Sequence, residues 1–173
     1  MELPAHVLRQ RDGVTCGPTV AVVAGALLRD DAELSDPDWF NDEQARVHAE
    51  VNRVWPRRLG TTPAGMARAL TARASGVRYR WRPFLGRRDT LSDVRRAVEA
   101  RLPVPMLIGR FIPRHWVLIV EAVGRQWRCY EPSSGTLRTV TVDAVRRSRL
   151  TGLGYPRPFA FVVPKASTRS ATI

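Results

Sequence analysis

The stretch CGPTVAVVAGALLR, residues 16–29, is the first long apolar segment of the chain and determines how the rest can be arranged. It is apolar on nearly every side, which is typical of a helix buried inside a protein. Pro18 suits the first turn of such a helix, where its missing N–H costs no helical hydrogen bond, and Gly17 allows close approach of neighbouring backbone. The sequence therefore predicts a buried helix with the thiol of Cys16 at its N-terminus.

After this helix, the spacing of apolar residues along the chain changes once, near Pro103, from helical to strand-like. Before that point we expect further helices at about residues 42–54, 64–71 and 92–101, and one strand at 76–81. After it, short β-rich runs alternate with turns, at residues 104–108, 115–123, 126–130, 137–142 and 159–163, with a short helix at 142–149. This order predicts an α+β fold in which N-terminal helices pack on a C-terminal antiparallel β-sheet.

Length and composition fit one compact domain. The chain has 173 residues, 44% hydrophobic and 25% charged, which is enough for a core that needs no disulfide or structural metal. We expect a single domain over residues 1–164 and a loose tail over residues 165–173. No apolar run approaches the ~18 residues of a membrane span, and the N-terminus lacks the pattern of a secretory signal. These features favour a cytoplasmic protein without a membrane partner; they leave export by a non-classical route open and do not fix the oligomeric state.

The formal net charge of +12 is unevenly distributed. The first 50 residues hold 10 acidic and 4 basic side chains, and the remainder holds 6 and 24. Every basic residue except Lys165 is arginine, which fits a codon bias as well as selection for arginine chemistry. The arginine pairs are scattered between apolar segments and are not interleaved with aromatics, so we do not expect nucleic acid as a partner. Two interpretations stay open: a solvated basic face, or the attraction of an acidic peptide or protein.

Four residues have the chemistry of a nucleophilic thiol site. Cys16 at a helix N-terminus gains thiolate stabilisation from the helix dipole, and its backbone N–H points toward the same space. Gln10, six residues upstream, can place a side-chain amide beside that N–H for an oxyanion. His115 begins the most hydrophobic strand, and Glu131 follows the end of the next one, where its carboxylate can bind the second imidazole nitrogen. Cys129 is expected to be a buried hydrophobic residue.

Each of these residues also has a structural interpretation when taken alone. A single cysteine at a helix start is commonly a small core residue, and a single histidine at a strand start is commonly structural. Cys16 and Cys129 lie 113 positions apart, which is no disulfide framework and no zinc-site spacing. We therefore expect no metal and no cofactor. The functional interpretation depends on the residues occurring together.

Together they resemble the papain-like fold in its bacterial C39-like peptidase form. The resemblance is carried by Gln10 with Cys16-Gly17-Pro18 opening an apolar helix, by His115-Trp116 beginning a β-hairpin, and by the turn Tyr-Glu-Pro-Ser-Ser-Gly at residues 130–135. Residues 60–63, Gly-Thr-Thr-Pro, and residues 103–105, Pro-Val-Pro, resemble the same family. The similarity extends over residues 8–163, nearly the whole chain.

The resemblance implies a role for each matching residue. Cys16 is the nucleophile, His115 the general base and then acid, and Gln10 the oxyanion donor. The acidic orienting residue falls on Glu131, where the family usually has Asp or Asn; Asp143 or an amide is the alternative. Gly17 and Trp116 are expected to lie at the substrate, although Trp116 equally fits a core aromatic on a strand.

The resulting function is that of a cysteine peptidase that hydrolyses a peptide bond of a peptide or protein substrate. The same constellation also serves an acyltransferase or isopeptidase, because water, amines and thiols can all accept the acyl group. Because Glu131 stands where the family usually has Asp or Asn, a third possibility stays open: a catalytically weak papain-like module that binds a peptide or protein. A basic protein associated with nucleic acid is the remaining, separate class.

Overall fold

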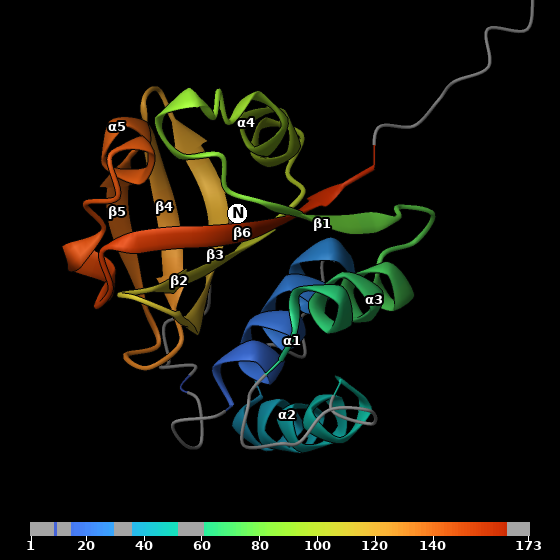
Figure 1. The fold of residues 1–173 in the computed structure, drawn as a ribbon. Coiled ribbons are helices and arrows are strands. Elements are labelled where there is room, and N and C mark those ends of the chain that lie inside the picture. The colour runs from blue at the N-terminus through green and yellow to red at the C-terminus, as the bar shows by residue number, and fades with distance from the viewer. Residues whose placement is uncertain (1–8, 10–14, 30–35, 52–60, 166–173) are drawn as a thin grey trace, which may run out of the picture.

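The computed structural model describes residues 9, 15–29, 36–51 and 61–165 (Figure 1). The helices are α1 Cys16–Arg29, α2 Pro37–Val51, α3 Pro63–Arg73, α4 Ser92–Glu99 and α5 Val142–Arg146, with short 3-10 turns η3 Gly86–Arg88 and η4 Thr151–Leu153. The strands are β1 Tyr79–Pro83, β2 Val104–Gly109, β3 Pro113–Val123, β4 Gln126–Glu131, β5 Thr136–Thr141 and β6 Arg157–Pro164. All strand pairs are antiparallel, and they form one sheet in the order β1-β6-β2-β3-β4-β5. The predicted α+β architecture is confirmed.

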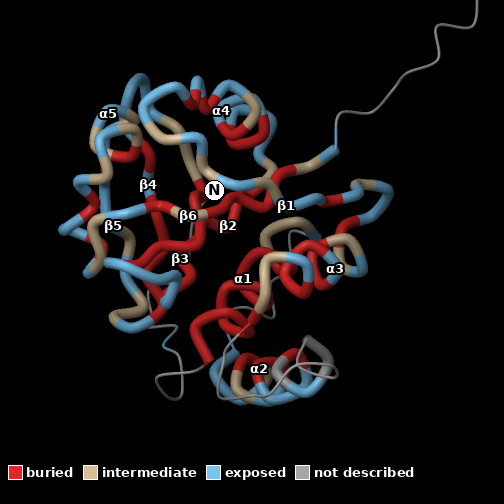
Figure 2. The backbone as a smooth tube through the Cα atoms, viewed as in Figure 1, coloured by how far each residue is buried: buried red, intermediate tan, exposed pale blue. Residues whose placement is uncertain are grey.

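Helices α1, α2 and α3 gather on one side of the sheet, and α4 and α5 lie on the other (Figure 1). The first eleven residues of α1 are buried, which agrees with its all-round apolar sequence (Figure 2). They pack against Trp116, Leu118 and Val120 of β3 in one hydrophobic core. The intervening residues Val117 and Ile119 face a second core on the α4 side. Strand β3 is therefore covered on both faces, which gives the residues at its start a rigid support.

Local capping explains two element boundaries. Helix α3 begins after Thr62, whose hydroxyl accepts a hydrogen bond from the Gly65 amide at 3.1 Å, as the Thr-Thr-Pro signal predicts. Helix α2 begins at Pro37, earlier than the expected residue 42, because Asp36 accepts from the Asp38 amide at 2.9 Å.

Strand β1 begins at Tyr79, later than the expected residue 76. Gly76 lies in the left-handed region at φ 77°, so the chain is still turning there. Of the expected tail, Lys165 belongs to the end of the sheet, since its amide donates to the Arg78 carbonyl at 2.7 Å. Residues 52–54 of the expected second helix and residues 166–173 lie outside the described part of the chain. Within the described ranges, no helix has the length and apolar character needed to cross a membrane.

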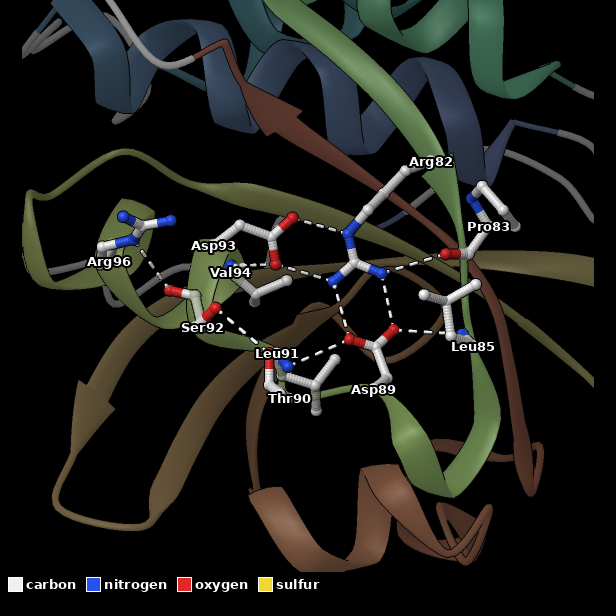
Figure 3. A network of polar contacts seen from close by, with 10 residues as sticks. All are labelled: Arg82, Pro83, Leu85, Asp89, Thr90, Leu91, Ser92, Asp93, Val94 and Arg96. Atoms are coloured by element: carbon white, nitrogen blue, oxygen red, sulfur yellow. Dashed lines mark hydrogen bonds and ion pairs between the residues drawn. The ribbon is translucent and has the colours of Figure 1, made fainter.

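A cluster of charged side chains fixes α4 to β1 (Figure 3). Arg82 donates through Nε to Asp93 Oδ2 and through Nη1 to Asp89 Oδ2, both at 2.6 Å, and its guanidinium lies over the Phe161 ring at 5.0 Å. Asp89 also accepts from the amides of two loop residues, Leu85 and Leu91. Burial alone disfavours these charges, but the mutual hydrogen bonds raise the pKa of Arg82 and lower that of Asp93. The cluster therefore stays ionised and holds the segment that leads into α4.

Candidate active site

Cys16 is the first residue of α1, and the start of this helix is anchored by hydrogen bonds. The Thr19 amide donates to the Thr15 carbonyl at 2.9 Å, and the Thr19 hydroxyl contacts both Thr15 O and Gln44 Oε1 at 2.8 Å. Gln44 in turn donates through Nε2 to the Arg9 carbonyl at 3.2 Å. The Cys16 side chain is 4% exposed. The thiol thus lies at a fixed, recessed helix N-terminus.

Gly17 and Trp116 connect the start of α1 to β3 by close packing. A Cβ on Gly17 would overlap the side chain of Thr61 and approach Cδ1 of Trp116 at 3.3 Å, so the position requires glycine. The Trp116 indole N–H donates to the Thr61 carbonyl at 2.9 Å and is fully buried. Because Gly17 follows Cys16 and Trp116 follows His115 in the chain, this contact fixes the neighbours of the thiol and the imidazole against each other.

His115 lies near the beginning of β3 and interacts with two side chains. Its Nε2 lies 2.8 Å from Oε1 of Glu131, the last residue of β4. The Cys16 side chain is the other group that acts on the imidazole, and its interaction raises the pKa of His115. Since Glu131 occupies Nε2, the nitrogen left for Cys16 is Nδ1. The imidazole therefore connects the thiol with the carboxylate.

Glu131 is held by the turn that follows it. The Ser133 amide donates to Oε1 at 2.8 Å and the Ser134 amide to Oε2 at 2.9 Å, while the Gly135 amide bonds the Glu131 carbonyl at 2.8 Å. Arg9, the residue before Gln10, donates to the Ser134 carbonyl at 3.2 Å and is thereby attached to the same turn. With both oxygens engaged and only 9% of the residue exposed, the carboxylate has a defined position.

These contacts set the protonation of the pair in opposite directions. Burial lowers the pKa of the imidazole, but the hydrogen bonds and negative charges of Cys16 and Glu131 outweigh it and raise the pKa of His115 from 6.5 to about 9. Burial raises the pKa of the Glu131 carboxyl, but the bonds from His115 and from the turn hold it well below 4.5. At neutral pH the histidine is therefore an imidazolium beside a carboxylate.

A cavity of about 250 Å³ borders the imidazole. His115 and Glu131 form one part of its wall, Ser133 and Arg138 another, and residues 152–155 the rest. The Tyr155 ring lies tilted against the imidazole at a centroid distance of 5.8 Å. Cys16 is not among the lining residues. The cavity therefore borders the imidazole of His115 but not the thiol of Cys16.

The predicted site residues fall into three groups. Cys16, His115 and Glu131 come together from α1, β3 and β4. Gly17 and Trp116 are buried beside them, and their contact with a substrate stays a prediction; Gln10 lies outside the described residues. Asp143, the alternative orienting residue, lies on α5 and bonds Arg147 at 3.0 Å.

Two lining residues, Arg138 and Tyr155, were not predicted to lie at the site, because one arginine in a strand and one tyrosine in a loop form no motif. Cys129 is fully buried, as expected, and burial raises the pKa of its thiol to about 12. Among the described residues, no group of three His, Cys, Asp or Glu side chains could hold a metal ion.

Comparison with known proteins finds similarity among solved structures. No protein-family model matches the chain, and no curated protein matches it. The structure is similar to a double glycine motif protease from an AMS/PCAT transporter, solved in complex with the leader peptide. The TM-score is 0.51 at 10% sequence identity, and the match covers 94% of each chain. The fold is therefore the papain-like fold of C39-type proteases, as the sequence resemblance implied.

Proposed function

We propose that this protein is a cysteine peptidase in which Cys16 attacks a peptide bond, with His115 and Glu131 as its catalytic partners. One observation carries the proposal: His115 lies between two partners, the Glu131 carboxylate at 2.8 Å from its Nε2 and the Cys16 side chain, whose interaction raises the pKa of the imidazole. Three residues from three separate elements converge in the order nucleophile, base and orienting acid. The protease fold of the similar structure supports the same reaction class.

In the first half of the reaction, the Cys16 thiolate forms a bond to the carbonyl carbon of the substrate, and the carbonyl π electrons move to oxygen. The N–H of Cys16, one of the amides at the start of α1 without a helical partner, donates to this oxyanion. Gln10 is the proposed second donor; its neighbour Arg9 is bonded to the turn after Glu131, which supports this assignment. When the tetrahedral intermediate collapses, the C–N bond breaks and the leaving nitrogen takes the proton of His115.

In the second half, water attacks the thioester that links the acyl group to Cys16. His115, now neutral, takes a proton from this water, the carbon–sulfur bond breaks, and the thiolate and imidazolium are restored. Glu131 keeps Nε2 protonated and the ring oriented throughout, so that Nδ1 faces the sulfur. An amine in place of water gives an acyltransferase on the same residues, and an isopeptide bond in place of the peptide bond gives an isopeptidase.

The longer side chain of Glu131 does not argue for a catalytically weak binding module. Glu131 reaches Nε2 at hydrogen-bond distance, and its turn binds both carboxylate oxygens. These contacts support giving Glu131 the orienting role that Asp or Asn has in the resembling family. For the substrate we propose a peptide or protein, since the similar protease was solved with a peptide, the leader peptide named in its description.

Labelling with an epoxysuccinyl probe, followed by mass-spectrometric mapping, tests the proposal. We expect modification at Cys16 in the wild type and none in Cys16→Ala. The matched control is Cys129→Ala, which removes the other thiol and should label like the wild type, because Cys129 is enclosed in the core. A folded protein that is not labelled, or is labelled at Cys129, contradicts the peptidase. Adding a primary amine to a cleavage assay then separates hydrolysis from acyl transfer by the product mass.

A further inference from the structure

The cavity beside His115 borders the side chain that, in the proposed mechanism, protonates the leaving nitrogen of the substrate. During acylation the carbonyl carbon is bonded to Cys16, while the departing nitrogen must lie next to the imidazole that protonates it. The cavity borders His115 and Glu131 but not Cys16, so a substrate bonded to Cys16 can reach it only by extending past the imidazole, and we infer that it receives residues after the scissile bond. Its volume of about 250 Å³ is below that of a site for a drug-sized ligand, which suits one residue of a peptide.

Arg138 gives this cavity a cationic wall. It lies on β5 opposite Cys129, and Glu131 pairs with Thr136 on the same two strands, so Arg138 and Glu131 share one face of the sheet. The side chain is exposed, and within the described residues it makes no hydrogen bond or ion pair. Its guanidinium is free to bind a carboxylate in a bidentate geometry.

The other titratable groups of the cavity do not neutralise Arg138. Glu131 is the single carboxylate among the lining residues, and its oxygens accept bonds from His115, Ser133 and Ser134. His115 bears a positive charge in the resting pair. The cavity wall thus carries two positive charges, on Arg138 and His115, and one negative charge, on Glu131, which is already hydrogen-bonded. We therefore expect the cavity to attract a negatively charged group.

We propose that this cavity binds an acidic side chain of the substrate, Asp or Glu, at one of the first two positions after the scissile bond, and that Arg138 is the residue that selects it. The inference rests on the proposed peptidase activity for its meaning in catalysis, but the cavity and its cation exist independently of cleavage.

The first test is cleavage-site profiling with a mixed peptide library, read by mass spectrometry. We expect Asp and Glu to be enriched after the cleaved bond by about 2- to 5-fold over Asn and Gln, the range of an exposed ion pair. Arg138→Gln should abolish the enrichment and Arg138→Glu should replace it with Lys and Arg. Arg80→Gln is the matched control: Arg80 is exposed on β1, the opposite edge strand, and its variant should keep the wild-type profile.

The second test measures binding without turnover. Cys16→Ala is titrated by NMR with the peptides Glu-Ala-Ala-amide, Gln-Ala-Ala-amide and Lys-Ala-Ala-amide, which mimic a released product. We expect the glutamate peptide to bind about 2- to 5-fold more tightly than the glutamine peptide, and this difference to vanish when Arg138→Gln is added. Equal binding of all three peptides overturns the proposal.

The two tests separate the possible failures. Acidic preference in binding without cleavage of any library peptide would refute the peptidase and leave the Arg138 site in place. Cleavage without acidic preference, or a preference that persists in Arg138→Glu, would refute the Arg138 site and leave the peptidase in place.

Discussion

Oε1 of Glu131 lies 2.8 Å from Nε2 of His115, and the same oxygen accepts the Ser133 amide at 2.8 Å. One carboxylate therefore fixes the imidazole and ties it to a β-turn. Aspartate or asparagine usually has this place in the resembling family. The extra methylene is compatible with the bond because the turn residues hold the longer side chain by its oxygens.

Removing the Glu131 carboxylate should impair catalysis without removing the nucleophile. We expect Glu131→Ala to lower kcat/KM by on the order of 100-fold, because the ring loses its orienting partner. Iodoacetamide should still alkylate Cys16 in this variant. Steady-state kinetics with a cleaved peptide, alongside Cys16→Ala as the inactive reference, measures the effect.

Asp143→Ala is the control for this experiment, since Asp143 was the alternative orienting residue and is bonded to Arg147 on α5. It should retain wild-type kcat/KM. A silent Glu131→Ala would show that another group orients the ring.

The pH dependence of kcat/KM should report the raised pKa of His115. In the proposed mechanism the imidazolium of His115 protonates the leaving nitrogen; it is present below about pH 9 and is lost as the pH rises through that value. Activity should accordingly decline on an alkaline limb near pH 9. Glu131→Gln removes a negative charge that raises the pKa, so its limb should move to lower pH. Rates between pH 6 and pH 10.5 decide this; an unmoved limb in Glu131→Gln would mean that Glu131 does not set the charge of the ring.

Sequence patterns predict most of this architecture and single out the three residues, Cys16, His115 and Glu131, that come together at the candidate site. The apolar run of α1 and the alternating strands have the periodicity of their elements, and the Cys16, His115 and Glu131 blocks carry recognisable neighbours. Helix α2 begins at Pro37, before the expected residue 42. Its start signal, Asp36-Pro37, is present in the sequence, but it lies among other acidic residues and is hard to distinguish from them.

Other features have no local pattern from which they could be predicted. Arg138 becomes part of the site through the β4–β5 register, and Tyr155 through the loop after η4. The need for glycine at position 17 comes from Thr61, which is 44 residues away in the chain. Such pairings are set by tertiary packing, and no periodicity of a single segment predicts them.

Gly17→Ala should destabilise the protein and misalign its site. The new Cβ would overlap the Thr61 side chain in a buried contact, so we expect a loss of about 1–3 kcal/mol in the free energy of unfolding. Gly152→Ala is the matched control, because its Cβ would meet no atom within 4 Å. Urea denaturation followed by tryptophan fluorescence compares them; equal stability of the two variants would contradict the packing constraint.

The Arg82 cluster should be a major structural contributor. Arg82→Met leaves the buried Asp89 and the partly buried Asp93 without their partner, so we expect a loss of about 3 kcal/mol in unfolding free energy. Arg95→Met removes an exposed pair with Glu99 and should cost less than about 1 kcal/mol. Thermal or urea unfolding measures both, and a small effect at Arg82 would contradict this role.

The same cluster predicts a loss of stability in acid. Burial raises the pKa of Asp93, but the Arg82 hydrogen bonds lower it below its unfolded value of 3.8. A lowered folded-state pKa contributes stability that is present above pH 3.8 and is lost as the pH falls below it. The difference in unfolding free energy between wild type and Arg82→Met should therefore shrink below pH 4. A difference that is constant from pH 7 to pH 3 would exclude this linkage.

The net charge of +12 yields a prediction about substrate encounter, separate from the chemistry. If the basic surface attracts an acidic peptide, KM should rise as the salt concentration increases from ~0.05 to ~0.3 M, where the Debye length falls below about 10 Å. The value of kcat should barely change, because long-range attraction acts on association and not on the bonded intermediate. Arg138→Gln should remove part of this salt dependence, since it removes the cation nearest the imidazole, whereas Arg80→Gln at the opposite edge of the sheet should remove less. A KM that stays constant over this range would assign the charge to a solvated face with no part in recognition.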